Sequence, residues 1–95
     1  MPVVLVHEGI TQEEYEETVR KITGGQSRMT SPSEWPVEGL LAHITGQGER
    51  GFRVVDVWES QEAVDRFAAE LIPILDEIGV QGQPEVYAAH TYVSA

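Results

Sequence analysis

The sequence contains no cysteine and no asparagine, and its single lysine and five arginines face 16 acidic residues. Without cysteine, the chain can form no disulfide and has no thiolate for catalysis or metal binding. The formal charge of −10 repels phosphate backbones and anionic lipid, which disfavours binding to nucleic acid or to a membrane surface. No apolar run approaches the roughly 18 residues that span a bilayer. We expect a soluble, cytoplasmic protein.

The length of 95 residues predicts one domain over residues 1–95. A chain of this size buries only about 60–65% of its unfolded surface, so its core is modest. Small domains without disulfides or metal sites often gain further burial by forming oligomers. An oligomer is therefore expected. The N-terminal segment has an acid at Glu8 and no basic cluster, so it is predicted to be a strand and not a signal peptide.

Apolar spacing and capping residues predict four strands and two helices. Thr11 and Glu14 have the spacing of a capping box, and Ser60 can cap the second helix. Gly24 and Gly79 are placed to end the two helices. The predicted elements are strands over 2–8, 39–45, 51–59 and 85–93, a helix from Thr11 to Gly24 and a helix from Ser60 to Gly79.

The order βαββαβ predicts a ferredoxin-like α+β fold, a four-stranded antiparallel sheet with both helices on one face. Gly46–Gly51 matches the dinucleotide pattern G-x-G-x-x-G by letter. That pattern requires a helix after the glycines, and here a strand follows, so the segment is predicted to be a hairpin turn.

Alternation along the strands divides the side chains between the two faces of the sheet. Small aliphatic residues suit contact with helices, so Val55 and Val57 are predicted to face them. By the same rule the helix side should hold Val4, Val6, Leu40, Ala42, Ile44, Tyr87, Ala89, Thr91 and Val93. The opposite side should hold Val3, Leu5, His7, Leu41, His43, Thr45, Phe52, Val54, Asp56, Trp58, Val86, Ala88, His90 and Tyr92. All three histidines are in the second set, on a face that would need a partner to cover it.

Gly51–Phe67 (GFRVVDVWESQEAVDRF) is a strand that leads directly into a helix, and Gly39–Gly46 (GLLAHITG) and Val86–Val93 (VYAAHTYV) support it. With these segments the chain resembles the dimeric α+β barrel superfamily, which includes the antibiotic biosynthesis monooxygenases, and is nearest to its small actinobacterial members. The resemblance implies a homodimer formed by pairing two sheets face to face. It also implies a ligand site in the barrel core, which would contain His43, Asp56, Trp58, His90 and His7.

The resemblance implies oxygenation without a bound cofactor. In one respect this sequence differs from the pattern of the group. The quinol oxygenases and haem-degrading members of the group use an asparagine in the pocket, and this chain has none. A histidine or a main-chain group would have to stabilise an oxyanion in its place.

His43, His90 and Asp56 are the candidate catalytic residues. A neutral histidine can take a proton from an acidic substrate, and a carboxylate can orient the imidazole. Two alternatives remain open for these three residues: a metal site of two histidines and one carboxylate, or a buried polar network at a dimer interface. The expected pocket wall consists of Trp58, His7, Phe52, Tyr92 and Leu41, with Trp35 and Met29 as a lid.

Together with these residues, the resemblance implies a cofactor-independent enzyme acting on a small aromatic or polyketide-like metabolite. It would oxygenate an enolisable substrate, or isomerise or cyclise one by proton transfer. The alternative is a non-catalytic barrel that binds a ligand or serves as a structural accessory protein. No metal, cofactor, nucleic acid or membrane is expected as a partner.

Overall fold

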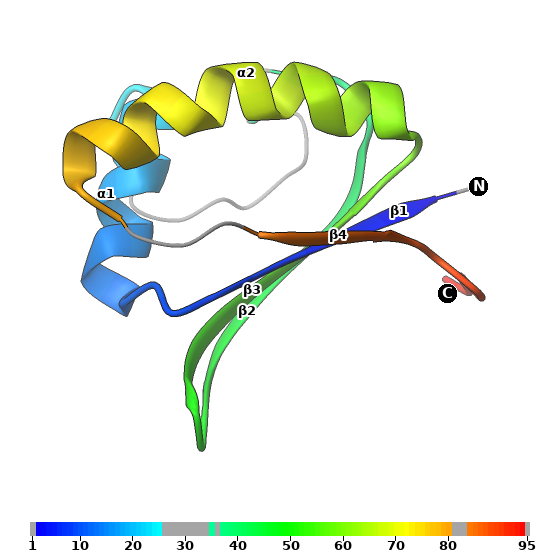
Figure 1. The fold of residues 1–95 in the computed structure, drawn as a ribbon, viewed down its shortest axis with the longest axis horizontal. Helices are drawn as coiled ribbons and strands as arrows, with labels where there is room; N and C mark the ends of the chain where they lie inside the picture. The colour runs from blue at the N-terminus through cyan, green and yellow to red at the C-terminus, as the bar shows by residue number, and fades with distance from the viewer. Residues whose placement is uncertain (1, 26–34, 36, 81–83, 95) are drawn as a thin grey trace.

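The computed structural model describes residues 2–25, 35, 37–80 and 84–94. Its elements follow the order βαββαβ, and both helices lie on one side of the sheet (Figure 1). The sheet order is β2-β3-β1-β4 with every neighbouring pair antiparallel, which confirms the ferredoxin-like fold. Within the described residues no helix is both long and apolar enough to cross a membrane. The elements are β1 (Val3–Glu8), α1 (Gln12–Thr23), β2 (Leu40–Gly48), β3 (Gly51–Trp58), α2 (Gln61–Ile78) and β4 (Glu85–Ala88).

Local sequence signals set the ends of both helices, as predicted. The Glu14 N–H donates to Thr11 Oγ1 (3.0 Å), and the Thr11 N–H donates to the Glu14 carboxylate (2.9 Å), completing a capping box at the start of α1. At the start of α2 the Ala63 N–H donates to Ser60 Oγ (3.1 Å). Gly24 and Gly79 end the helices at φ values of 80° and 88°, in the left-handed region that glycine adopts without a steric penalty.

Two strand boundaries differ from the prediction by more than one residue. β2 continues to Gly48, which pairs with Gly51, so the hairpin turn consists only of residues 49–50. β4 ends at Ala88, where the prediction continued to 93. Ala88 pairs with Val3, the first residue of β1, so no residue of β1 remains to pair with a longer β4.

The predicted assignment of the two sheet faces is wrong for β1, β3 and β4, and for the part of β2 that follows Leu40. Phe52, Val54, Asp56 and Trp58 are buried on the side of the sheet that faces the helices, and the ring of Trp58 stacks on Phe67 of α2 at 4.8 Å. Large side chains remove more apolar surface from water than valines do, so the aromatic set goes to the helix interface. The β1 set with Leu5 and His7 lies on the same side. Alternation puts on the open face several residues that were predicted to face the helices. They are Val4, Val6, Ala42, Ile44, Val55, Val57 and Tyr87.

A bulge changes the alternation in β2. Leu40 pairs with Trp58 and Ala42 with Val57, which leaves Leu41 as the extra residue. Leu40 and His43 therefore both lie on the helix side although they are three residues apart. The helix-side prediction is right for Leu40, which is buried, whereas the bulged Leu41 is exposed.

Gly39, just before the bulge, provides a test of this junction between β2 and α2. Its φ is 112°, and an added Cβ would lie 2.7 Å from Ala63 Cβ. Gly39→Ala should therefore lower the free energy of unfolding by about 1–3 kcal/mol, because it combines backbone strain with a clash in the core. Urea denaturation measures the loss. Gly46→Ala is the matched control in the same strand, since its φ is ordinary and nothing lies within 4 Å. Equal effects of the two substitutions would contradict the close packing at Gly39.

Candidate functional site

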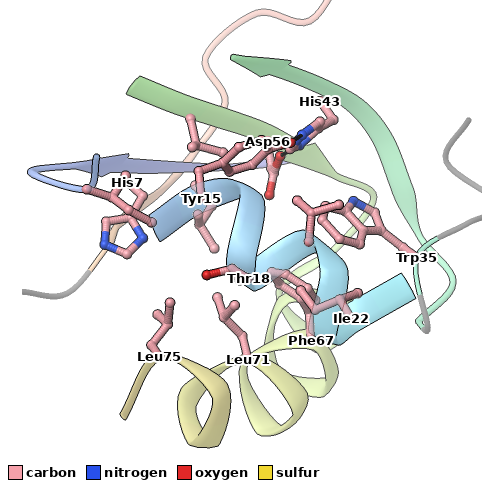
Figure 2. A pocket seen from close by; sticks show the side chains of 14 residues that line it. His7, Tyr15, Thr18, Ile22, Trp35, His43, Asp56, Phe67, Leu71 and Leu75 are labelled. Atoms are coloured by element: carbon pink, nitrogen blue, oxygen red, sulfur yellow. Dashed lines mark hydrogen bonds and ion pairs between the residues drawn. The ribbon is translucent and has the colours of Figure 1, made fainter. Parts of the chain in front are cut away.

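A small cavity of about 30 Å³ lies between the sheet and the two helices (Figure 2). That volume holds about one water molecule. Most of the wall is apolar, and the polar residues come from β1, β2, β3, α1 and the segment before β2. The wall consists of Leu5, His7, Ile10, Tyr15, Thr18, Val19, Ile22, Trp35, His43, Val54, Asp56, Phe67, Leu71 and Leu75.

Three of these residues form one chain of hydrogen bonds. His43 Nδ1 lies 2.5 Å from Asp56 Oδ1, and His43 Nε2 lies 2.5 Å from the Tyr15 hydroxyl. A neutral imidazole with its proton on Nδ1 donates to Asp56 and accepts from Tyr15. The arrangement links β3, β2 and α1, and it depends on the bulge at Leu41, which turns His43 toward the helices. We call Tyr15, His43 and Asp56 the relay.

Aromatic rings enclose the relay. The indole of Trp35 contacts the His43 ring edge-on, with centroids 5.2 Å apart, and also packs on Phe67 at 5.5 Å. Phe52 packs on Tyr15 at 5.3 Å. Asp56 is only 2% exposed. Hydrogen bonds strengthen in such a low-dielectric setting, so the buried carboxylate holds the imidazole in one orientation.

Two residues of the cavity wall have a side-chain nitrogen with no hydrogen-bond partner among the described residues. The atoms are His7 Nε2 and Trp35 Nε1, and both are buried. Burial lowers the pKa of His7 below its ordinary value of 6.5, and the negative charges of Asp56 and Glu14 oppose that shift without reversing it. His7 is therefore neutral near pH 7. Trp58 Nε1 is also buried without a partner, but Trp58 does not line the cavity.

The structure brings His43, Asp56 and His7 together and leaves His90 apart. His90 is exposed beyond the end of β4, which is the opposite sheet edge from β2, and its Nδ1 contacts Thr91 Oγ1 at 3.0 Å. The metal site of His43, Asp56 and His90 therefore does not assemble. Elsewhere in the part of the chain that the structure describes, no group of three His, Asp or Glu residues could hold a metal either.

Some of the other predicted pocket residues lie at or near the pocket, and others lie away from it. Phe52 lies beside the relay through its contact with Tyr15, and Trp58 is fully buried behind the pocket against Phe67. Tyr92 and Leu41 are partly exposed and do not line the cavity. Of the predicted lid, Trp35 is buried in the pocket wall, and Met29 lies outside the described residues.

The predicted location of the site, in a barrel core between two sheets, is wrong because His43 and Asp56 face the helices of their own chain. Sequence reasoning also missed Tyr15, which is absent from the predicted catalytic and pocket residues. A usable signal was present, since Tyr15 is the first aromatic residue on the buried face of a helix rich in acids. That signal could not identify the hydrogen-bond partner of Tyr15, which is His43, 28 positions later in the chain.

The lowered pKa of His7 predicts a pH dependence of stability. As the pH falls below about 6.5, the unfolded chain binds a proton at His7 before the folded chain does, so the free energy of unfolding decreases toward the lower folded pKa. Above 6.5 the full contribution is present. Chemical denaturation at about pH 7.5 and 5.5 should show a smaller decrease for His7→Gln than for the wild type. His90→Gln, at an exposed position, should keep the wild-type decrease; an unchanged decrease in His7→Gln would contradict the prediction.

Comparison with known proteins supports the fold. No protein-family model matches the chain, and no curated protein matches it. Among solved structures, the chain is similar to a monooxygenase from the gene ActVA-Orf6 of Streptomyces coelicolor, determined in complex with the ligand nanaomycin D. The TM-score is 0.50 and the identity 23%, over 99% of this chain and 91% of the other. At this identity the likeness concerns the fold alone, and it agrees with the ferredoxin-like order of helices and strands described above.

Proposed function

We propose that this protein is a monooxygenase-like enzyme that acts on a small aromatic or polyketide-like molecule and needs no bound cofactor. The observation that carries the proposal is the relay, a hydrogen-bonded Tyr–His–Asp chain on the wall of an apolar cavity. The fold shared with a monooxygenase that was solved with nanaomycin D supports it. Oxygenation of an enolisable molecule requires a base and dioxygen, and the relay supplies the base.

The proton moves along the relay in two coupled transfers. An acidic O–H or C–H of the substrate gives its proton to the Tyr15 oxygen, while the Tyr15 hydroxyl proton passes to His43 Nε2. The resulting imidazolium lies beside the buried Asp56 carboxylate, which stabilises its charge. The substrate becomes an anion, and the proton that it lost is held on His43.

Dioxygen then oxidises the substrate anion. The carbanion carbon gives two electrons to dioxygen and forms a C–O bond, and the proton on His43 returns to the peroxide. Loss of water from this hydroperoxide converts the original CH₂ into C=O, so that CH₂ and O₂ yield C=O and H₂O. Without dioxygen, the same proton transfer would isomerise or cyclise the substrate.

The size of the cavity sets a condition on this chemistry. About 30 Å³ accommodates a water molecule and not an aromatic ring, so a ring enters only when side chains of the wall move apart. If they do not move, the relay is a polar network in a non-catalytic accessory protein. Measured turnover separates these two functions.

Substitutions in the relay should abolish most of the activity. Tyr15→Phe, His43→Gln and Asp56→Asn should each lower kcat by roughly 10²–10⁴-fold, the usual contribution of general acid–base catalysis. The assay follows oxygen uptake and conversion of anthrone to anthraquinone, corrected for the spontaneous reaction. Tyr92→Phe is the matched control, because Tyr92 lies outside the pocket wall. No wild-type rate above background with anthrone and related enolisable phenols, or full activity of Tyr15→Phe, would refute the enzyme proposal.

We also propose that the chain forms a homodimer through the open face of the sheet, the helix-free face predicted to pair, although that face holds the other set of side chains. That face exposes Ile44 (61%) and Tyr87 (48%), and the half-buried Val55 and Val57 lie between them on the central part of the sheet. Contiguous exposed apolar side chains of this kind are typical of protein interfaces. The pairing of sheets implied by the superfamily resemblance supports the same partner.

A charge on this face should separate the two copies. Ile44→Asp should shift the protein from dimer to monomer in sedimentation velocity, because an unpaired carboxylate in an apolar interface is strongly unfavourable. Ile72→Asp provides the control, since Ile72 is similarly exposed (56%) but lies on α2. A wild-type monomer at tens of micromolar, or equal dissociation in both variants, would argue against this interface.

A further inference from the structure

The two unpartnered nitrogens of the cavity lie at separate places on its wall. His7 projects from the end of β1, and Trp35 precedes β2; Figure 2 shows them on opposite sides of Tyr15 and Thr18. Each residue is more than nine-tenths buried. Native proteins rarely bury a polar group without a hydrogen-bond partner, so such atoms call for an explanation.

The remaining polar side chains of the wall do not share this property. Asp56 and His43 bond to each other, and Tyr15 bonds to His43. The Thr18 hydroxyl donates to the carbonyl oxygen of Glu14 at 2.8 Å. Among the described residues of the wall, only His7 Nε2 and Trp35 Nε1 are buried with no partner in the described part of the chain.

We propose that Trp35 Nε1–H and His7 Nε2 are the groups that hold the ligand of this pocket. The indole N–H can only donate, so the ligand must present an acceptor oxygen at the Trp35 end. The neutral imidazole of His7 binds a second polar group. This deepens the proposed function, because it rests on the same pocket and assigns residues that position the ligand beside the relay.

Charge and packing define the ligand further. Asp56 on β3 and Glu14 on α1 are the charged groups that act on His7, and both are acidic. They disfavour a carboxylate or phosphate at that end, so the second polar group is a neutral hydroxyl. Most of the other residues of the wall are apolar, with Val19, Phe67 and Leu71 among them. The ligand is therefore a largely apolar molecule with a carbonyl oxygen at one end and a hydroxyl at the other.

The indole N–H resonances of the two tryptophans test the Trp35 bond directly. A ¹H–¹⁵N spectrum of the wild-type protein is recorded during titration with 5-hydroxy-1,4-naphthoquinone. The Trp35 indole proton should move downfield as its hydrogen bond forms, while the Trp58 indole, buried and unpartnered but away from the cavity, should stay in place. Titration with 1-methylnaphthalene, which has no oxygen, should cause no downfield movement. The absence of any Trp35 shift with the quinone would overturn the proposal and leave the cavity to a water molecule.

Binding constants of variants test the same pair independently. Trp35→Phe keeps an aromatic ring and loses the donor, so the Kd of the quinone should rise about five- to tenfold, the usual effect of one hydrogen bond, while that of 1-methylnaphthalene changes little. His7→Leu should weaken quinone binding similarly, and His90→Leu should not. Equal weakening for both probes would overturn the proposal, because it would indicate packing alone.

These outcomes are separable from those of the proposed function. Tyr15→Phe should bind the quinone with little change in Kd even where turnover is lost. A downfield Trp35 shift in a protein without turnover would support ligand binding by Trp35 and His7 and contradict the proposal that the protein is an enzyme. Turnover that depends on Tyr15, together with no Trp35 shift, would support the enzyme proposal and contradict ligand binding by Trp35 and His7.

Discussion

The buried carboxylate of Asp56 is the constraint on which the rest of the site depends. A charge in the centre of a sheet and beneath two helices is strongly unfavourable unless it is paired. His43 provides the partner at 2.5 Å, and it can do so only because the bulge at Leu41 changes the alternation of β2. The second nitrogen of His43 then needs a partner of its own, and Tyr15 of α1 supplies it. One buried acid thus ties two strands and a helix together.

Stability alone does not account for this arrangement. Replacing a buried ion pair by well-packed apolar residues of similar volume often stabilises a protein. Here the polar chain is kept on the wall of a cavity that also contains two unpaired nitrogens, so the cost of several buried polar groups is concentrated at one place. Such concentration is characteristic of a site arranged for a ligand, because the unpaired groups gain their partners when the ligand binds.

Features that depend on local chemistry were predicted correctly from the sequence. Features that depend on tertiary contacts were not. The capping box at Thr11, the cap at Ser60 and the two terminal glycines gave the helices, and the element order gave the fold. The faces of the sheet could not be predicted from size alone, because the choice between valines and aromatics depends on the residues of the helices, such as Phe67, that meet them. The bulge at Leu41 leaves no mark in the sequence, and the pairing of Tyr15 with His43 joins positions far apart in the chain.

The relay faces the helices of its own chain, and this position separates the site from the proposed dimer interface. Each chain contains the whole relay and both holding nitrogens, so the chemistry requires no residue from a second copy. The open face, with Ile44 and Tyr87, then has no polar site to preserve and can be covered by any complementary apolar surface. Assembly through that face would act on the site only through the sheet, because β3 presents Asp56 to the pocket and Val55 and Val57 to the other side. A dimer would therefore stiffen the strand that holds the acid, and the relay would gain orientation without gaining a residue.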